Sequence, residues 1–328
     1  MQKIKFERLG IVLQPETEQF KTIAKFNAGM IHEDGIIHMV FRYAKWRDEY
    51  DPTCQSNYQV DETRYAKLTL DGKVLEESTE ALIAPSLPWD VSGCQDARIV
   101  PFEGWYYLTY CGWDIDDAPA NGHTPRMGFA RTKDFRSVEK LGIVDHYAMD
   151  KDHYIFPERI GGKIALVHRI VPNIQIEYFD SIEDMVDPTF WAKYTAEDTE
   201  RSTVLRAEFP WECGKVGGSI PPIKTDDGWL FVYHGVQHFP DRPFIYRVGL
   251  ALLDLENPSK VIARLPYPVM EPTCNYEIHG DVGNVVFPVG GFIHEGSLYL
   301  SYGGADRVVA LAKAPMDAIM DELRAHKL

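Results

Sequence analysis

Apolar and aromatic residues occur in short runs, each following a turn that ends in glycine, and this pattern appears five times along the chain. The runs are "DGIIHMVFRY", "EGWYYLTYCG", "GGKIALVHRI", "DGWLFVYHGV" and "EGSLYLSYGG", with their glycines at Gly35, Gly104, Gly162, Gly228 and Gly296. The pattern recurs roughly every 60 to 70 residues. A glycine-containing turn between alternating apolar runs predicts a β-hairpin.

A further strand-like run precedes each hairpin, and one or two more follow it, which makes about four strands per unit. Five such units predict an all-β fold, a five-bladed β-propeller that forms a single domain over residues 1–328. The N-terminal "FERLGIV" resembles "VEKLGIV" at 138–144, so we expect it to be an outer strand that closes the last blade. Only the C-terminal segment has a helical pattern, which predicts a short helix over 316–326.

Composition narrows the range of partners. The chain has 328 residues, of which 45% are hydrophobic, so it can bury a large core. Its formal net charge of −15 argues against a nucleic-acid surface and disfavours anionic membranes. Five scattered cysteines without a CxxC spacing are typical of reduced thiols. Because no apolar run resembles a signal peptide or a membrane span, we expect a soluble, cytoplasmic protein.

Polar residues occupy the same position in each predicted unit, just before the first strand of the hairpin. They are Asn27, Asp96, Lys151 with Asp152, Ser219 and Asp281, and the second strands end near Arg42, Tyr110, Arg169, His234 and Tyr302. In a propeller these positions converge at one end of the central channel. Taken singly, Asp96 is equally well explained as a turn cap, Lys151 as a solvated lysine, His234 as a core histidine, and the arginines as structural ion-pair partners. Their convergence favours a binding site.

Other chemistries lack their motifs. The sequence contains no P-loop, no GxGxxG that opens a helix, no HExxH and no GxSxG. The histidines have no metal-ligand spacing, so we expect neither a metal nor an organic cofactor.

Seven stretches resemble glycoside hydrolase family 130, which contains β-mannoside phosphorylases and related mannosidases built as five-bladed propellers. They are "FNAGMI" (26–31), "GCQDARI" (93–99), "DKDHYIFPERIGGKIALVHR" (150–169), "GGSIPPIKTDDGWLFVYHG" (217–235), "YRVGLALLDLENP" (246–258), "GDVGNVVFPVG" (280–290) and "YGGAD" (302–306). The resemblance covers nearly the whole chain. It implies that inorganic phosphate, as co-substrate, cleaves a short β-mannoside with inversion to give α-mannose 1-phosphate.

The resemblance also implies roles for individual residues. Asp96 matches the general acid, which acts through a sugar hydroxyl. The phosphate-binding candidates are Lys151, Tyr246, His234 and one of Arg126 and Arg131, which the alignment does not separate; the substrate-binding candidates are Asn27, Arg42, Arg98, Asp152, Arg169, Asp281 and Asp306. Phosphate is already a nucleophile, so one prominent carboxyl is expected to suffice where an inverting hydrolase needs two. This chain has Gln95 and Ala97 where the usual acid motif has glutamate and proline.

Two other functions remain open from the sequence. One is a β-mannoside hydrolase on the same scaffold, and the other is a propeller that binds carbohydrate without catalysis. The phosphate-binding candidates favour the phosphorylase. The expected partners are therefore a β-mannoside oligosaccharide and phosphate, and the sequence leaves a homo-oligomer open.

Overall fold

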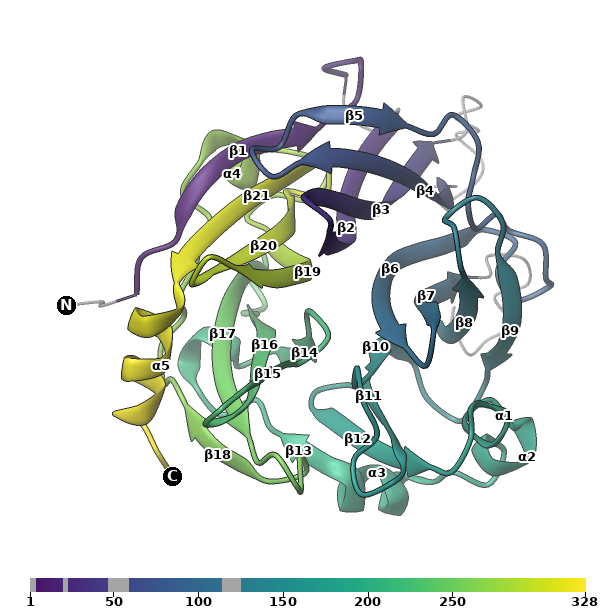
Figure 1. Cartoon of the computed structure of the whole chain (residues 1–328), viewed down its shortest axis with the longest axis vertical. Coiled ribbons are helices and arrows are strands. Elements are labelled where there is room, and N and C mark those ends of the chain that lie inside the picture. Colours follow the sequence, from purple (N-terminus) through teal and green to yellow (C-terminus); the bar gives the residue numbers. More distant parts are fainter. Residues whose placement is uncertain (1–3, 20–22, 47–58, 114–124) are drawn as a thin grey trace.

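The computed structural model describes residues 4–19, 23–46, 59–113 and 125–328, and this part of the chain is mostly β. Its sheets stand side by side around a common centre, with β2, β6, β10, β14 and β19 nearest to that centre (Figure 1). Each of these inner strands pairs antiparallel with the next longer or comparable strand of its own sheet, namely β3, β7, β11, β16 and β20. The inner strands are therefore the elements that can bring side chains from distant parts of the sequence together.

The largest sheet contains eight strands in two antiparallel groups. The first group is β2 (Ile23–Glu33), β3 (Ile36–Trp46), β4 (Gln59–Thr69) and β5 (Val74–Glu77). The second is β6 (Gly93–Phe102), β7 (Trp105–Trp113), β8 (Arg126–Thr132) and β9 (Glu139–Val144). A single parallel pair, Asp61 with Gly93, joins the two groups.

Three smaller sheets complete the arrangement. One is β10 (Asp150–Ile155), β11 (Ile164–Ile170), β12 (Ile174–Phe179) and β13 (Thr203–Leu205). The next is β14 (Lys215–Gly218), β15 (Ile223–Thr225), β16 (Gly228–Gln237), β17 (Ile245–Leu253) and β18 (Val261–Arg264). The last is β19 (Val286–His294), β20 (Ser297–Gly304) and β21 (Val308–Pro315), with β1 (Glu7–Leu13) added antiparallel to β21. The first and last strands of the chain thus share one sheet.

The five predicted hairpins are present, because each glycine turn lies just before the second strand of its pair. At Asp34 and Gly35 both φ angles are positive, 49° and 79°. Two successive positive φ angles are typical of the type I′ turn, whose twist matches that of the strands it joins. The glycine pattern therefore predicts these turns because glycine readily adopts the positive φ angles that they require.

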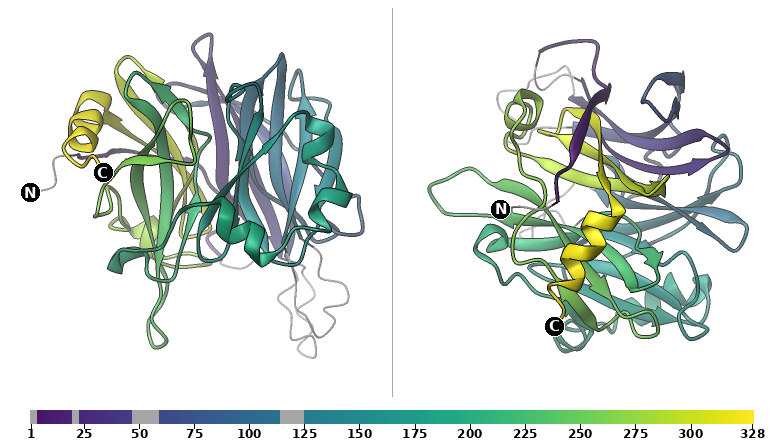
Figure 2. Two further views of the ribbon diagram at one scale, coloured as in Figure 1. Left: turned by 90° about the horizontal axis from the view of Figure 1, so that it is seen from below. Right: turned by 60° about the vertical axis from the view of Figure 1, so that its left-hand side comes forward.

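The C-terminal helix is present as α5 (Met316–Arg324), two residues shorter at its end than predicted. Its Ile319, Met320 and Leu323 pack into the core between the last two sheets, and α5 lies on the outside of the ring (Figure 2). The expectation that no other segment is helical is wrong. Four short α-helices, α1 (Ile182–Met185), α2 (Pro188–Trp191), α3 (Ala196–Ser202) and α4 (Asn275–Ile278), and one 3-10 turn, η1 (Pro210–Glu212), are also present.

Helices α1 to α3 form an insertion between β12 and β13. Side chains of Ser181, Asp187 and Thr195 accept hydrogen bonds from backbone N–H groups in the first turns of the three helices. Trp191 is fully buried and packs the insertion against the sheet that contains β10 to β13. These helices have only one or two turns, so their amphipathic period is too short to recognise in the sequence.

Close packing of the inner strands leaves no room for side chains at two glycines. A Cβ atom at Gly29 would lie 2.4 Å from the Ala97 carbonyl oxygen, and one at Gly290 would lie 2.1 Å from the Met30 nitrogen. Strands β19, β2 and β6 therefore approach backbone to backbone at the centre.

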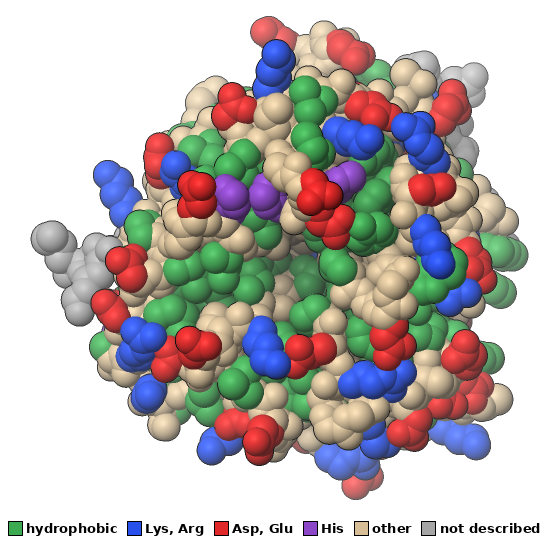
Figure 3. Space-filling model, viewed as in Figure 1, with side chains coloured by type: hydrophobic (Ala, Val, Ile, Leu, Met, Phe, Trp, Pro, Cys, Tyr) green, Lys and Arg blue, Asp and Glu red, His purple; other side chains and the backbone are tan. Residues whose placement is uncertain are grey.

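The outer surface carries interspersed acidic and basic side chains around its rim, with a hollowed, mainly uncharged middle on the face in Figure 3. No helix in the described part of the chain is long and apolar enough to cross a membrane.

Candidate active site

Three inner strands share the same backbone irregularity. The strand register shifts in β2 between Phe26 and Gly29, and the corresponding shifts in β6 and β10 surround residues 96 and 152. At these bulges Asn27, Asp96 and Asp152 adopt left-handed φ angles of 47°, 54° and 57°. Asn and Asp tolerate this conformation better than other residues with a side chain. Because a bulge redirects the side chain that it carries, three polar groups turn toward the centre at matching positions.

Asp96 is 3% exposed and has two partners, both on the same oxygen. Asn27 Nδ2 donates a hydrogen bond to Asp96 Oδ1 at 2.8 Å, and Arg42 Nη1 donates to it at 3.3 Å. Arg42 is shared, because its Nη2 also donates to Asp61 Oδ2 at 3.0 Å. Within the described part of the chain no donor reaches Asp96 Oδ2. That oxygen is the atom of this carboxyl that remains available to a ligand.

Gln95 supports this arrangement from the side. Its amide donates to Asp61 Oδ2, the same carboxyl that holds Arg42. A glutamate at this position would instead place a second negative charge against Asp61. The amide therefore fits the local charge balance of this chain.

Asp152 is the centre of a buried ion-pair network. Arg98 Nη2 lies 3.2 Å from Asp152 Oδ1, and Arg169 donates twice to Oδ2, at 2.8 and 3.0 Å. Burial alone would raise the pKa of Asp152, but Arg169, together with His234, Lys151 and Arg98, outweighs it and holds the pKa well below its usual range. Asp152 is therefore an ionised anchor for two arginines.

Arg98 is almost fully occupied by protein acceptors. Its Nη1 donates to the Asp96 carbonyl oxygen at 2.8 Å, and its other nitrogens reach the carbonyl oxygens of Gly218 and Ser219. At 1% exposed it lies beneath the site and ties the bulge of β6 to β14. The structure therefore places Arg98 where it positions the Asp96 backbone.

Two lysines contrast with these paired arginines. Lys151 of β10 and Lys215 of β14 form no ion pair with any carboxylate among the residues that the structure describes. The two lysines are neighbours, because the charge of Lys151 is one of those that lower the pKa of Lys215. Lys215 was not predicted from the sequence, which pointed to Ser219 in this unit. A charged residue at the start of the inner strand was the available signal.

Asp306 links the acid and the first lysine. Burial raises its pKa to about 6; Arg42 and Lys151 oppose the rise, and the negative charges of Asp96 and Asp281 add to it. These five charged groups therefore lie in one electrostatic neighbourhood. The backbone at Asp306 is also left-handed, with a φ of 50°.

His234 and Tyr246 form an uncharged wall of the site. Their rings stack with centroids 6.0 Å apart. Burial lowers the pKa of His234 to about 3, although Asp152, 3.6 Å from His234 Nε2, opposes the shift. Burial raises the pKa of Tyr246, so its phenol keeps its proton. Both side chains can hydrogen-bond to an anion near neutral pH without adding charge.

The remaining predicted residues form ion pairs of their own. Asp281 pairs with Arg307 at 3.2 Å. Arg126 lies opposite Gly112, at the end of β8 nearer to the acid, and pairs with Asp145 at 3.0 Å. Arg131 lies near the other end of β8, where it pairs with Glu139 at 2.8 Å and packs over the Trp105 ring. The structure thus separates two arginines that the alignment left equivalent.

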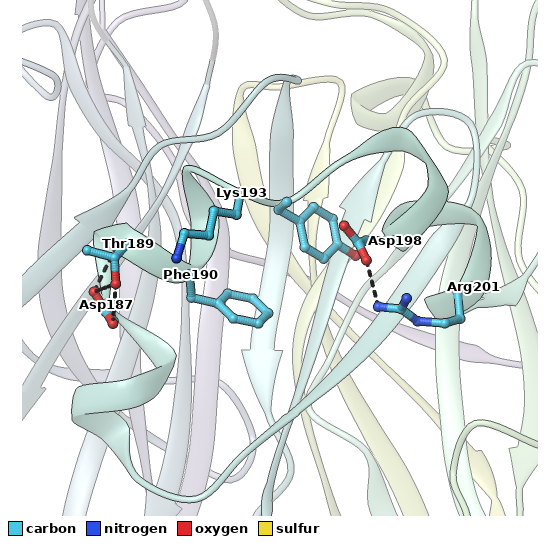
Figure 4. Close-up of a pocket in the computed structure, with 7 residues that line it drawn as sticks. Asp187, Thr189, Phe190, Lys193, Asp198 and Arg201 are labelled. Atoms are coloured by element: carbon cyan, nitrogen blue, oxygen red, sulfur yellow. Dashed lines mark hydrogen bonds and ion pairs between the residues drawn. The ribbon is translucent and has the colours of Figure 1, made fainter.

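A separate pocket of about 420 Å³ lies on the helical insertion, outside this cluster (Figure 4). Four of its polar side chains pair with one another: Thr189 donates to Asp187, and Arg201 pairs with Asp198 at 2.6 Å. None of the predicted site residues lines it.

Comparison with known proteins decides the family. A family profile described as beta-1,4-mannooligosaccharide phosphorylase matches residues 7–325. The chain belongs to glycoside hydrolase family 130. Two relatives from Thermoanaerobacter sp. (strain X514) cover almost the full length: a 1,2-beta-oligomannan phosphorylase, 33% identical over 96% of this chain and 99% of its own, and a beta-1,2-mannobiose phosphorylase, 32% identical over 92% and 93%.

A family 130 structure has the same fold. It is the beta-1,2-mannobiose phosphorylase of Listeria innocua in complex with beta-1,2-mannobiose. It superposes with a TM-score of 0.77 at 23% identity, covering 98% of this chain and 99% of that chain. The resemblance predicted from the seven sequence stretches is confirmed at the level of the family.

Proposed function

We propose that this protein is an inverting β-mannoside phosphorylase that acts on a short β-mannoside and inorganic phosphate and releases α-mannose 1-phosphate. We further propose that its substrate is β-1,2-linked, because the two relatives that are 32% and 33% identical are named for β-1,2-mannosides. The reaction needs no cofactor beyond phosphate as co-substrate.

The observation that supports this proposal is that an acid with an open oxygen lies close to lysines that lack a carboxylate partner among the described residues. Asp96 has one carboxylate oxygen open to a ligand, and Lys151 and Lys215 lie in the same neighbourhood without a carboxylate partner among the described residues. Cations without protein counter-ions form a suitable site for a dianion. A site of this kind supports attack by phosphate.

The proposed chemistry follows from that arrangement. A phosphate oxygen forms a bond to the anomeric carbon while the glycosidic bond breaks, and the leaving oxygen receives a proton that comes from Asp96 through a sugar hydroxyl. Asn27 and Arg42 orient the acid. Lys151, with Arg126, His234 and Tyr246, holds phosphate.

Other residues support this chemistry indirectly. Arg98, Asp152 and Arg169 fix the bulges and the field around the site. Asp281 and Asp306 face the sugar. Arg131, which lies near the other end of β8, has no role in this proposal.

We also propose that the whole chain is one five-bladed propeller. The supporting observation is that strands β2–β5, β6–β9, β10–β13, β14–β18 and β19–β21 with β1 follow one another around the centre (Figure 1). The single parallel pair between the first two groups is then a contact between neighbouring blades.

A direct assay tests the function. The protein is incubated with β-1,2- and β-1,4-mannobiose, with and without phosphate, and both mannose 1-phosphate and free mannose are quantified. Phosphate-dependent mannose 1-phosphate is expected. Free mannose that forms irrespective of phosphate would identify a hydrolase, and no turnover across a wide panel with retained sugar binding would identify a binding protein.

Hydrolysis would need a second carboxyl to activate water. Besides Asp96, the candidates are Asp152, Asp281 and Asp306, which the sequence assigned to substrate binding, and Asp61, which the sequence did not indicate. Of these four, Asp61, Asp152 and Asp281 have arginine partners, whereas Asp306 has no ion pair within the described residues. Asp306→Asn should therefore abolish any hydrolysis while leaving phosphorolysis measurable.

A further inference from the structure

Asp150 is the first residue of β10, the strand that carries Lys151, and it is 1% exposed. Three donors reach its carboxylate. His168 Nδ1 lies 2.6 Å and His146 Nε2 lies 2.9 Å from the same oxygen, Oδ2, and the backbone N–H of Arg169 donates to Oδ1 at 2.9 Å. A carboxylate that accepts three hydrogen bonds is held in its ionised form. The proposed reaction uses none of His146, Asp150 and His168, which we call the His–Asp–His cluster.

Each histidine of the cluster uses one defined nitrogen for the carboxylate. His146 Nδ1 accepts a hydrogen bond from the backbone N–H of Ala148 at 3.3 Å, so the ring proton is on Nε2, which donates to Asp150. His168 donates from Nδ1, and its buried Nε2 has no hydrogen-bond partner among the described residues. A substitution can therefore keep or remove each donor separately.

The helical insertion holds both imidazole rings from the outer side. Trp191 of α2 stacks on the His146 ring, with centroids 5.5 Å apart and an interplanar angle of 25°. It meets the His168 ring edge-on, at 5.6 Å and 82°. Because Trp191 and His168 are fully buried, neither ring can turn away from the carboxylate without a loss of packing.

The cluster is joined directly to the chain segments that carry two phosphate-binding candidates. The backbone N–H of Asp150 donates to the carbonyl oxygen of Pro125, the residue before Arg126, at 3.1 Å. Lys151 follows Asp150 and lies opposite Arg169, and the bulge of β10 begins immediately after Lys151. A bulge disrupts the hydrogen bonds of the strand ladder. The side-chain bonds of Asp150 therefore fix the strand at the point where the ladder is interrupted.

We propose that Asp150, held by His146 and His168, is a positioning residue for the phosphate site and sets the places of Lys151 and Arg126. An ionised carboxylate repels phosphate, so Asp150 acts through its neighbours rather than by contact. This inference rests on the proposed phosphorylase function and adds to it the support of its phosphate side. Loss of the cluster should weaken phosphate binding and leave mannoside binding nearly unchanged.

A matched pair of variants isolates the hydrogen bond from the ring. His168→Leu and His168→Asn both remove the imidazole and its contact with Trp191, and leucine and asparagine are similar in size. Only asparagine keeps an N–H donor near the position of Nδ1. His38→Leu is the control, because His38 of β3 is a partly buried histidine that pairs with the Tyr65 hydroxyl at 2.7 Å, apart from the cluster.

Steady-state kinetics with each substrate varied in turn measure kcat and both KM values, and thermal melting verifies that each variant is folded. His168→Leu should raise the phosphate KM by about tenfold and leave the mannoside KM within about twofold. His168→Asn should recover most of the phosphate KM, and His38→Leu should leave both KM values unchanged. If His168→Leu does not fold, His146→Met and His146→Gln make the same comparison, because glutamine keeps a donor near Nε2.

Three results would overturn the inference. They are the same phosphate KM in the leucine and asparagine variants of His168, an equal rise of both KM values, and a lower melting temperature with both KM values unchanged. The proposed function fails separately. If wild type produces no mannose 1-phosphate, calorimetry measures the dissociation constant of inorganic phosphate for the same proteins. Weaker binding by His168→Leu than by His168→Asn would then uphold the positioning role while the reaction is wrong, and no phosphate binding by wild type would overturn both.

Discussion

The amide of Asn27 donates a hydrogen bond to Asp96 across 2.8 Å, and the two residues occupy the same left-handed bulge position in neighbouring inner strands. Neither position is regular β-structure, with φ angles of 47° and 54°. Strain of this kind persists only where the surrounding structure enforces it. Here the enforcement is visible: a Cβ atom at Gly303 would lie 2.0 Å from Asn27 Oδ1, so the site requires glycine behind the amide.

Asp96→Asn tests the acid directly. Asparagine accepts the same hydrogen bond and tolerates the left-handed backbone, but it cannot deliver a proton. We expect the rate of mannose 1-phosphate formation to fall by about 10²–10⁴-fold. The melting temperature should change by only about 3 °C, because Arg42 keeps its pair with Asp61. Turnover close to that of wild type in this variant would rule out Asp96 as the acid.

Lys151→Ala separates phosphate binding from sugar binding. Removing one charge-assisted contact should raise the phosphate KM by about tenfold or more, with a much smaller change in the mannoside KM. Steady-state kinetics with each substrate varied in turn measure the two constants. Lys163→Ala is the control, because Lys163 lies on the β10–β11 turn and pairs with exposed Asp180. Equal increases in both KM values would contradict a phosphate role for Lys151.

Arg126 and Arg131 form a matched pair for the same assay. Five residues apart along a strand, their Cα atoms are separated by about 17 Å. Arg131 has an exposed partner, Glu139, and packs over Trp105, so Arg131→Met should leave the phosphate KM within about twofold of wild type. Arg126→Met should raise it. A larger increase of the phosphate KM in Arg131→Met than in Arg126→Met would show that phosphate binds near the other end of β8.

The sequence predicted those parts of the fold that depend on residues close together in the chain. Alternating apolar residues and glycine turns revealed the hairpins. Asn27, Asp96 and Asp152 were expected just before the first strand of each hairpin, but they lie within the inner strands β2, β6 and β10. The bulges that turn these side chains inward were not predictable, because they depend on how β2, β6 and β10 pair with their neighbours.

Other features depend on three-dimensional context. Arg98 resembled a substrate contact in the sequence, yet its donors are used by Asp152 and by backbone carbonyls of a strand more than a hundred positions away. Lys215 was not predicted, because what distinguishes it is that no carboxylate pairs with it among the described residues, and only the folded structure shows this.

Asp306→Asn should make the stability of the enzyme less sensitive to pH. Burial raises the pKa of Asp306 from 3.8 to about 6, so the folded state favours the protonated carboxyl. This group's contribution to stability is present at low pH and is lost as pH rises from about 4 to 6, because the unfolded chain ionises first. Asparagine mimics the protonated form and tolerates the φ of 50°.

The expected difference can be measured by urea unfolding of both proteins between pH 4 and 7.5. Near pH 4 their free energies of unfolding should nearly coincide, and above pH 6 the variant should be more stable by about 1–3 kcal/mol, the upper figure being reduced by partial solvent exposure. Asp180→Asn, at an exposed position between β12 and α1, should show no such divergence. A constant difference across the whole range would mean that Asp306 does not carry the raised pKa, and that the crowding of negative charge around the acid is weaker than the geometry indicates.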